Sequence, residues 1–157
     1  MKKLSAVLLV DDDETTNFLN EHLLRKLGVA DTVLMARNGE EALHLLAETC
    51  VPGATNCPEL ILLDMNMPVM SGIDFLEAFQ PVPPAQPIRV IILTTTMHPH
   101  DLARLQLLPH AGLLHKPLTR DKIDTVLRDH FQRQLPAVAS QGPTGLSLVA
   151  SALLWLR

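Results

Sequence analysis

The sequence predicts an α/β fold in which a single doubly wound parallel sheet carries helices on both faces. Three short runs of branched apolar residues show no polar alternation, which indicates strands buried on both sides. Segments with helical spacing of apolar residues separate these runs, so strands and helices alternate as a parallel sheet requires. Polar residues directly follow several runs, which places candidate chemistry at one edge of the sheet. The three runs are residues 6–10, 60–63 and 90–93.

The first half of the chain predicts two strand–helix units. Residues 6–10 form the first strand, and the helix after it ends near Gly28, because glycine is common just past a helix C-terminus. Residues 32–36 form the second strand. Asn38 followed by Glu41 resembles a capping box that opens the next helix. The apolar stripe of the first helix is Phe18, Leu19, Leu23, Leu24 and Leu27, and that of the second is Leu43, Leu46 and Ala47.

The second half predicts three further units. Residues 60–63 form the third strand, and Ser71 with Asp74 resembles the cap of a third helix. Residues 90–93 form the fourth strand, and a fourth helix is expected around 101–108. Residues 112–115 form the fifth strand. The last helix carries apolar and aromatic residues at helical spacing, namely Ile123, Val126, Leu127, His130 and Phe131. The sheet therefore has five strands.

Composition changes at Gln134, which divides the chain into a domain over 1–133 and a C-terminal tail over 134–157. Within the tail, residues 146–156 are apolar and too short for a membrane span. They form either a short helix that packs on the domain, on a second copy in a homodimer or on another partner, or a disordered extension. Residues 51–58 and 80–87 are surface loops, since they are rich in turn residues.

Length, charge and cysteine content exclude several classes of protein. The chain has 157 residues, and 47% of them are hydrophobic, which is enough for one packed core. A net charge of −4 without any Lys/Arg run argues against direct nucleic-acid binding. The apolar stretch after the N-terminal lysines is too short for a signal peptide, and a cytoplasmic protein is expected. Cys50 and Cys57 are accordingly expected to be free thiols, with a disulfide or a metal site as the alternative.

Polar side chains stand at the carboxyl ends of four predicted strands. Three aspartates, residues 11–13, follow the first strand, Asp64 ends the third, Thr94 ends the fourth, and Lys116 ends the fifth just before Pro117. Clustered carboxylates attract a hard divalent cation such as Mg²⁺. A carboxylate that attacks a phosphoryl group needs positive charge from a metal and an ammonium group, and a hydroxyl can bind a phosphoryl oxygen.

Each of these residues also has a simpler explanation. Aspartates after a strand often cap the next helix, a threonine is a common strand residue, and a lysine before a proline is usually solvated. The occurrence of all four at strand ends favours a phosphoryl-transfer site. The neighbouring His98 and His100 are interpreted as surface residues, with half of a metal site as the alternative.

The motifs that carry this chemistry resemble the response-regulator receiver family from Ala6 to about Arg133. They are Val-Leu-Leu-Val-Asp-Asp-Asp-Glu at 7–14, Leu-Ile-Leu-Leu-Asp-Met-Asn-Met-Pro at 60–68, Ser71-Gly72, Val-Ile-Ile-Leu-Thr-Thr at 90–95 and His-Lys-Pro-Leu at 115–118. The resemblance implies a flavodoxin-like fold with strand order 2-1-3-4-5. It also implies a signalling phosphoacceptor, not an enzyme beyond Mg²⁺-dependent self-phosphorylation and self-dephosphorylation.

The resemblance assigns a role to each residue of the site. Asp64 is the expected phosphoacceptor, Asp12 binds Mg²⁺ directly, Asp11 binds it largely through water, and Asn66 offers its backbone carbonyl. Thr94 and Lys116 are expected to contact the phosphoryl group, and Asp13 is interpreted as a helix cap. A sensor histidine kinase or a histidine phosphotransfer protein is the implied donor. A separate, unknown protein would read the switched surface, since no output domain follows the receiver in this sequence.

The sequence departs from the family pattern at two places. Leu113 stands three residues before Lys116, where receivers commonly carry Tyr or Phe, so the aromatic switch of the family is in doubt. The interval between the acidic pair and Asp64 is longer than usual, and the extra residues fall in the loop between Cys50 and Cys57.

Two other functions stay open. One is a phosphatase with an aspartyl-phosphate intermediate. Enzymes of the haloacid-dehalogenase type want a second aspartate two positions after the nucleophile, and Asn66 stands there. The other is a binding module that does not depend on phosphorylation, although such modules typically lose acidic residues that this chain keeps. A flavin or nucleotide binder would need a phosphate-binding loop where the three aspartates stand.

Overall fold

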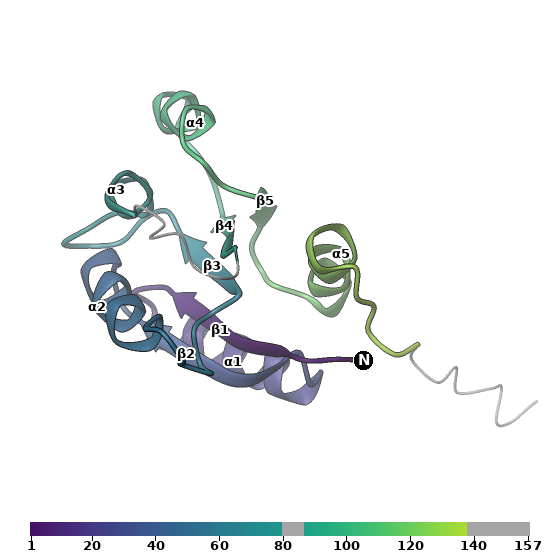
Figure 1. Ribbon diagram of the computed structural model, residues 1–157. Coiled ribbons are helices and arrows are strands. Elements are labelled where there is room, and N and C mark those ends of the chain that lie inside the picture. The colour runs from purple at the N-terminus through teal and green to yellow at the C-terminus, as the bar shows by residue number, and fades with distance from the viewer. Residues whose placement is uncertain (80–86, 138–157) are drawn as a thin grey trace, which may run out of the picture.

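The strands pair in parallel in the order β2-β1-β3-β4-β5, as the computed structural model, which describes residues 1–79 and 87–137, shows (Figure 1). The strands are β1 (Leu4–Val10), β2 (Ala30–Ala36), β3 (Leu60–Asp64), β4 (Arg89–Thr94) and β5 (Gly112–His115). The helices are α1 (Glu14–Lys26), α2 (Gly39–Thr49), α3 (Gly72–Ala78), α4 (Pro99–Gln106) and α5 (Arg120–Phe131). The predicted flavodoxin-like α/β fold and its strand order are confirmed.

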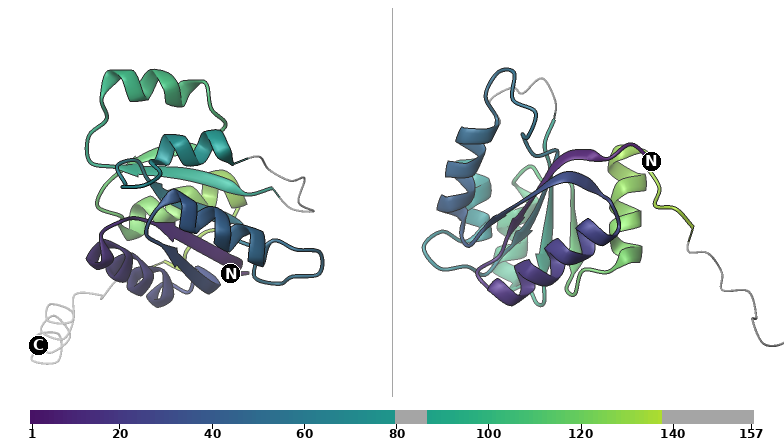
Figure 2. Two further views of the ribbon diagram at one scale, coloured as in Figure 1. Left: turned by 90° about the vertical axis from the view of Figure 1, so that its left-hand side faces the viewer. Right: turned by 90° about the horizontal axis from the view of Figure 1, so that it is seen from below.

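Helices cover both faces of the sheet and enclose two apolar layers (Figure 2). Alternate residues of each strand point to opposite faces, so Val7 and Leu9 of β1 pack on one side, and Leu8 and Val10 pack on the other. The first layer receives α1 and α5, and the second receives α2, α3 and α4. The continuous apolar runs of β1 and β3 are explained by this burial on both faces.

The predicted stripe of α1 is partly wrong. Phe18 and Leu19 are 65% and 58% exposed, whereas Leu24 is fully buried. The inward face instead begins with the buried polar residues Asn17 and Asn20, which lie two turns and one turn before Leu24, respectively. Because these two exposed residues are apolar, the sequence pattern predicted the wrong side of the helix as the buried one. A similar shift occurs in α2, where Ala42 is buried next to Leu46 and the predicted Ala47 is exposed.

Side-chain caps set where the helices begin. The predicted capping box of Ser71 and Asp74 is present in full. Asn38 caps α2 by accepting from the N–H of Glu41, but the Glu41 carboxylate accepts from Arg37, so only half of that predicted box forms. The fourth helix begins two residues earlier than expected. His98 caps it through its ring nitrogen, and proline at the first helical position is favourable because it needs no hydrogen-bond acceptor.

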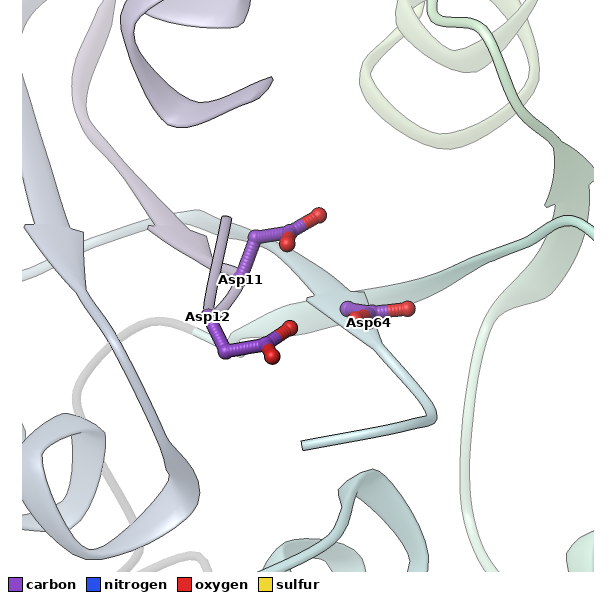
Figure 3. Close-up of side chains that lie close together, drawn as sticks. All are labelled: Asp11, Asp12 and Asp64. Carbon is purple, nitrogen blue, oxygen red and sulfur yellow. The ribbon is translucent and has the colours of Figure 1, made fainter. Parts of the chain in front are cut away.

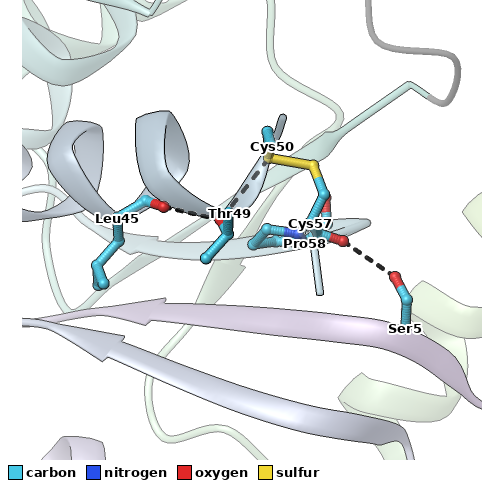
Figure 4. The surroundings of a disulfide bond; sticks show 6 residues. All are labelled: Ser5, Leu45, Thr49, Cys50, Cys57 and Pro58. Carbon is cyan, nitrogen blue, oxygen red and sulfur yellow. Dashed lines mark hydrogen bonds between the residues drawn. A yellow bond between two sulfur atoms is a disulfide. The ribbon is translucent and has the colours of Figure 1, made fainter. Parts of the chain in front are cut away.

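Cys50 and Cys57 form a disulfide bond, which corrects the expectation of free thiols (Figure 4). Cys50 follows the last turn of α2 and Cys57 precedes β3, and their Cα atoms lie 4.6 Å apart. The Cys57 carbonyl also accepts a hydrogen bond from the Ser5 hydroxyl, which ties the loop to β1. The expectation rested on cellular compartment, and that argument carries no information about how close the two side chains lie.

The chain turns back along α5 after the helix ends. Gln132 adopts the left-handed conformation, and the N–H of Arg133 donates to the Leu127 carbonyl. One helical turn earlier, the buried Asp124 accepts from the N–H of Leu135, whose side chain lies in the first core layer. The predicted apolar helix over 146–156 and nearly all of the loop over 80–87 lie outside the described residues. No helix within 1–79 and 87–137 combines the length and hydropathy needed to cross a membrane.

Candidate functional site

Three aspartates meet where β1 and β3 end. Val10 pairs with Leu63, so the next residues, Asp11 just after β1 and Asp64 at the end of β3, lie side by side. Asp12 follows Asp11, and ligand atoms of all three carboxylates lie within 4.8 Å of one another. Figure 3 shows the three side chains gathered at this edge. The sequence-based expectation that strand-end carboxylates converge is therefore met.

Burial and charge make these carboxylates unusual. Asp11 and Asp64 are only 4% and 6% exposed, whereas Asp12 is open to solvent. Burial raises the pKa of Asp64, and the neighbouring Asp11 charge raises it further, while Lys116 opposes the shift in part. Because two buried carboxylates and an exposed one offer hard oxygen ligands, the donor set fits a divalent cation such as Mg²⁺.

Lys116 supplies positive charge at the centre of this cluster. Its ammonium nitrogen lies 2.6 Å from Oδ2 of Asp11 and 3.3 Å from Oδ1 of Asp64. Burial alone would lower the pKa of the ammonium group, but the hydrogen bonds and charges of the two aspartates outweigh burial and raise it. The lysine is therefore charged and lies beside Asp64, the carboxylate that the family resemblance implies as the phosphoacceptor.

Thr94 lies at the end of β4 and is 1% exposed. Its hydroxyl donates to the Thr96 carbonyl at 2.9 Å, within the connection that leads to α4. Its own carbonyl accepts from the N–H of Lys116 at 2.9 Å. Thr94 therefore links the ends of β4 and β5, and its hydroxyl is bonded to the connection between β4 and α4.

Asp13 is a helix cap, as predicted. Its carboxylate accepts from the N–H of Thr15 and the hydroxyl of Thr16, at 3.0 and 2.9 Å. These bonds, led by that of the Thr16 hydroxyl, lower the pKa of Asp13. The N–H of Asp13 donates to Oδ1 of Asp11 at 2.9 Å, so the start of α1 also orients one site carboxylate.

The sequence analysis missed Asn17, a buried residue of α1. Its side-chain amide donates to the carbonyls of Asp11 and Ala36, at 2.9 and 3.3 Å, and so joins the ends of β1 and β2. The available signal was that Asn17 and Asn20 share a helical face with Leu24. The inward face of α1 was predicted wrongly because the apolar residues Phe18 and Leu19 were assigned to it.

Gly72 allows α3 to begin directly beside Asp64. A Cβ atom at this position would lie 2.6 Å from the Asp64 carbonyl oxygen and 2.9 Å from the Cα of Met65, which no side chain tolerates. The N–H of Gly72 also donates to the Met65 carbonyl. The short loop that follows the proposed phosphoacceptor, which contains Asn66, therefore folds tightly back against the strand end.

Two other predicted features lie around the site. Leu113, on β5 three residues before Lys116, is 38% exposed, so an aliphatic side chain occupies the position where an aromatic residue is usual in receivers. The ring of His98 accepts from the N–H of His100 and caps α4. Among the described residues, only the three aspartates gather as a potential metal site, and the two histidines do not join them.

A family model described as the response regulator receiver domain matches residues 7–128. The chain is 30% identical over 125 residues to a probable chemotaxis protein CheY of Rhizobium etli, which covers 80% of this chain and 91% of that protein. It is 31% identical over 136 residues to the autoinducer 1 sensor kinase/phosphatase LuxN of Vibrio campbellii, which covers 87% of this chain. The match spans only 15% of the length of LuxN.

Solved structures of similar chains agree with this result. The fold matches a two-component response regulator from Cytophaga hutchinsonii with a TM-score of 0.70 and 26% identity, over 84% of this chain and 100% of that chain. It matches the chemotaxis protein CheY4 of Vibrio cholerae with a TM-score of 0.64 and 27% identity, over 78% and 95%. Together with the acidic pocket at the strand ends, these matches show that the chain belongs to the response regulator receiver domain family of two-component signalling.

Proposed function

We propose that this chain accepts a phosphoryl group on Asp64 and thereby switches a surface that a partner protein reads. One observation carries the proposal. The Asp64 carboxylate is buried at a strand end with two further carboxylates and the ammonium group of Lys116 within reach. A buried carboxylate with a raised pKa beside a lysine is suited to attack an electrophile whose negative charge the site neutralises.

Asp11, Asp12, Asp64 and the backbone carbonyl of Asn66 would hold Mg²⁺ at this site. When bound, the ion offsets the repulsion between the carboxylates and the negatively charged phosphoryl donor. Asp12 suits direct ligation because it is exposed and makes no cap, whereas Asp13 is already engaged at the start of α1. Asp11 is shared with Lys116, which supports a contact to the ion through water.

In the proposed reaction, an oxygen of Asp64 forms a bond to phosphorus while the bond between phosphorus and the donor breaks. The electron pair of the broken bond stays with the leaving group, which is the imidazole nitrogen of a phosphohistidine. Lys116 would then pair with a phosphoryl oxygen in place of an Asp64 oxygen. The Thr94 hydroxyl would exchange the Thr96 carbonyl for a phosphoryl oxygen, and this exchange would move the connection between β4 and α4.

The donor in this proposal is a sensor histidine kinase or a histidine phosphotransfer protein. The partner that reads the switched surface is a separate protein, and the cytoplasm is the proposed location.

We propose a receiver over 1–133 and a tail over 134–157. The buried Leu135 indicates that the first residues of the tail pack on α5, and a homodimer remains a second proposal for the rest of the tail.

The test is incorporation of a phosphoryl group from acetyl phosphate, with and without Mg²⁺, followed by intact-protein mass spectrometry. The expected result is one phosphoryl group per chain, in the presence of Mg²⁺ only. Continuous turnover of the donor without an accumulated phosphoprotein would favour a phosphatase. Partner binding without any incorporation would favour a phosphorylation-independent module, and either result would overturn the proposal.

A further inference from the structure

Lys122 lies in the first turn of α5 and bonds to the backbone on both sides of Lys116. Its ammonium nitrogen donates to the His115 carbonyl at 2.6 Å and to the Pro117 carbonyl at 2.9 Å. His115 is the last residue of β5, and Pro117 begins the connection to α5. One side chain therefore binds the two peptide carbonyls that flank the lysine of the site.

This position is electrostatically unfavourable for a lysine. The N-terminus of a helix carries partial positive charge and favours acidic residues, whereas cations are favourable at the other end. Lys122 is the third residue of α5, and its backbone N–H donates to the hydroxyl of the capping residue Thr119. A positive charge at this helix end costs stability. The two hydrogen bonds of the Lys122 ammonium group to backbone carbonyls offset that cost.

The backbone around Lys116 is otherwise held on one side only. The N–H of Lys116 donates to the Thr94 carbonyl, which joins it to β4. In the described sheet β5 pairs with β4 and is the last strand in the order, so its outer side has no neighbouring strand to fix the turn after His115. Lys122 supplies that restraint from α5. When the backbone on both sides of Lys116 is fixed, the position of the Lys116 Cα atom is fixed as well.

We propose that Lys122 is the positioning residue for Lys116. Its two hydrogen bonds fix the turn from which the Lys116 ammonium group reaches Asp11 and Asp64. Lys122 itself touches neither the carboxylates nor the phosphoryl group. The inference rests on the proposed function, because it assigns to Lys122 an effect on phosphoryl transfer that passes entirely through Lys116.

The test is a double-mutant cycle between Lys122→Met and Lys116→Ala. Methionine keeps an unbranched apolar side chain and removes the ammonium group. At saturating Mg²⁺ and acetyl phosphate, Lys122→Met should slow labelling of Asp64 about tenfold, because misplacing a group that contacts the reacting atoms by about 1 Å can cost up to about a hundredfold in rate. In the Lys116→Ala background the same substitution should change the rate no further. Lys26→Met, at an exposed lysine in the last turn of α1, is the matched control and should label as fast as the unmodified chain.

The cycle separates positioning from two simpler effects. A loss of stability, or of general positive charge, would slow labelling by the same factor with and without Lys116, and that result would overturn the inference. An unchanged rate in Lys122→Met alone would overturn it as well. Circular dichroism and the urea midpoint of each variant identify any loss of folded protein, and rates are compared per folded chain.

Amide hydrogen exchange provides a readout that does not depend on phosphorylation. The expected result is faster exchange of the Lys116 N–H in Lys122→Met, by several-fold relative to the amides in the middle of α5. If the unmodified chain takes up no phosphoryl group, the proposed function fails, and the exchange rate still tests whether Lys122 fixes the turn. If exchange of the Lys116 N–H is the same in Lys122→Met as in the unmodified chain, the positioning role is contradicted, even if the unmodified chain is labelled at Asp64.

Discussion

Lys116 lies closer to Asp11 than to Asp64: its ammonium nitrogen is 2.6 Å from Oδ2 of Asp11 and 3.3 Å from Oδ1 of Asp64. The lysine thus bridges the first and third strands through their carboxylates. A metal ion that binds the same carboxylates shares Asp11 with this ammonium group. The positive charge of Lys116 therefore acts in two opposite ways, since it weakens cation binding and favours the arrival of an anionic phosphoryl group.

We expect Lys116→Ala to bind Mg²⁺ about three- to tenfold more tightly, because a neighbouring positive charge is removed. The same variant should take up a phosphoryl group from acetyl phosphate about tenfold more slowly or worse, since the charge that faces the phosphoryl oxygens is lost. Titration calorimetry and labelling rates measure the two effects. A near-native circular dichroism spectrum is expected, because the lysine side chain is only partly buried and packs little.

Lys26→Ala is the control for this prediction, since it removes one positive charge from an exposed helix end away from the strand ends. Weaker Mg²⁺ binding in Lys116→Ala, or unimpaired signalling to a partner once one is known, would show that Lys116 does not have the role assigned to it.

Asp12→Asn should weaken Mg²⁺ binding much more than Asp13→Asn. Asp12 is an exposed member of the three-carboxylate cluster, whereas the Asp13 carboxylate caps α1, and asparagine is an equally good cap. Loss of a direct charged ligand should cost at least about tenfold in affinity, and loss of the cap charge much less. Magnesium titration of both variants decides the matter. A larger loss for Asp13→Asn would mean that the register along the acidic run is off by one residue.

Asp64→Asn should stabilise the metal-free protein at neutral pH. The pKa of Asp64 is raised in the folded state by burial and by Asp11, so the ionised carboxylate costs stability. This cost is absent below the ordinary pKa of 3.8 and grows as pH rises through the raised pKa. The gain in melting temperature should therefore be a few degrees at pH 7 and shrink as pH falls toward 4.

Magnesium should stabilise the unmodified chain more than it stabilises Asp64→Asn. The ion binds the folded state and should raise the melting temperature of the unmodified chain with its concentration. It should raise that of Asp64→Asn much less, because one carboxylate ligand is gone. If Asp64→Asn is less stable than the unmodified chain at pH 7 without metal, the ionised Asp64 carboxylate does not destabilise the fold as proposed.

The strand ends were predictable because they depend on local pattern. The apolar runs of β1, β3 and β4 mark the strands, and in a parallel sheet every carboxyl end after a right-handed crossover lies at one edge. Asp11, Asp64 and Thr94 were therefore expected at the same edge of the sheet. The cap of Asp13 was equally local, since a carboxylate two or three residues before free N–H groups binds them.

The residues that the sequence did not reveal act across distance. Asn17 binds the Ala36 carbonyl at the end of β2, and Lys122 binds the His115 and Pro117 carbonyls, which requires the start of α5 to fold back against the end of β5. The inward face of α1 was misjudged because Phe18 and Leu19, although apolar, point to solvent. The pairing of Cys50 with Cys57 depends on how the end of α2 approaches β3. Patterns along the chain contain none of this geometry.

The disulfide between Cys50 and Cys57 should stabilise the fold by closing a loop in the unfolded chain. For two residues seven positions apart, loop entropy gives about 2–3 kcal/mol. Replacing both cysteines by serine should lower the free energy of unfolding in urea by that amount, and a thiol reductant should lower that of the unmodified chain equally. The reductant should leave the serine variant unchanged, which is the control.

Thiol alkylation immediately after cell lysis measures the state of these cysteines in the cell. Reducing compartments keep thiols free, and the cytoplasm is the proposed location of this chain. Two alkylated cysteines in the denatured, unreduced protein would show that the bond does not form under those conditions.

The measurement that tests the central claim most directly is identification of the phosphorylated residue. The protein is treated with acetyl phosphate and Mg²⁺, and the acyl phosphate is then reduced with borohydride, which converts the modified aspartate to homoserine. Peptide mass spectrometry locates that residue. The account predicts homoserine at position 64 only, none without Mg²⁺, and none in Asp64→Asn. Homoserine at position 11, 12 or 13, or labelling of the Asp64→Asn protein to the same extent, would contradict it.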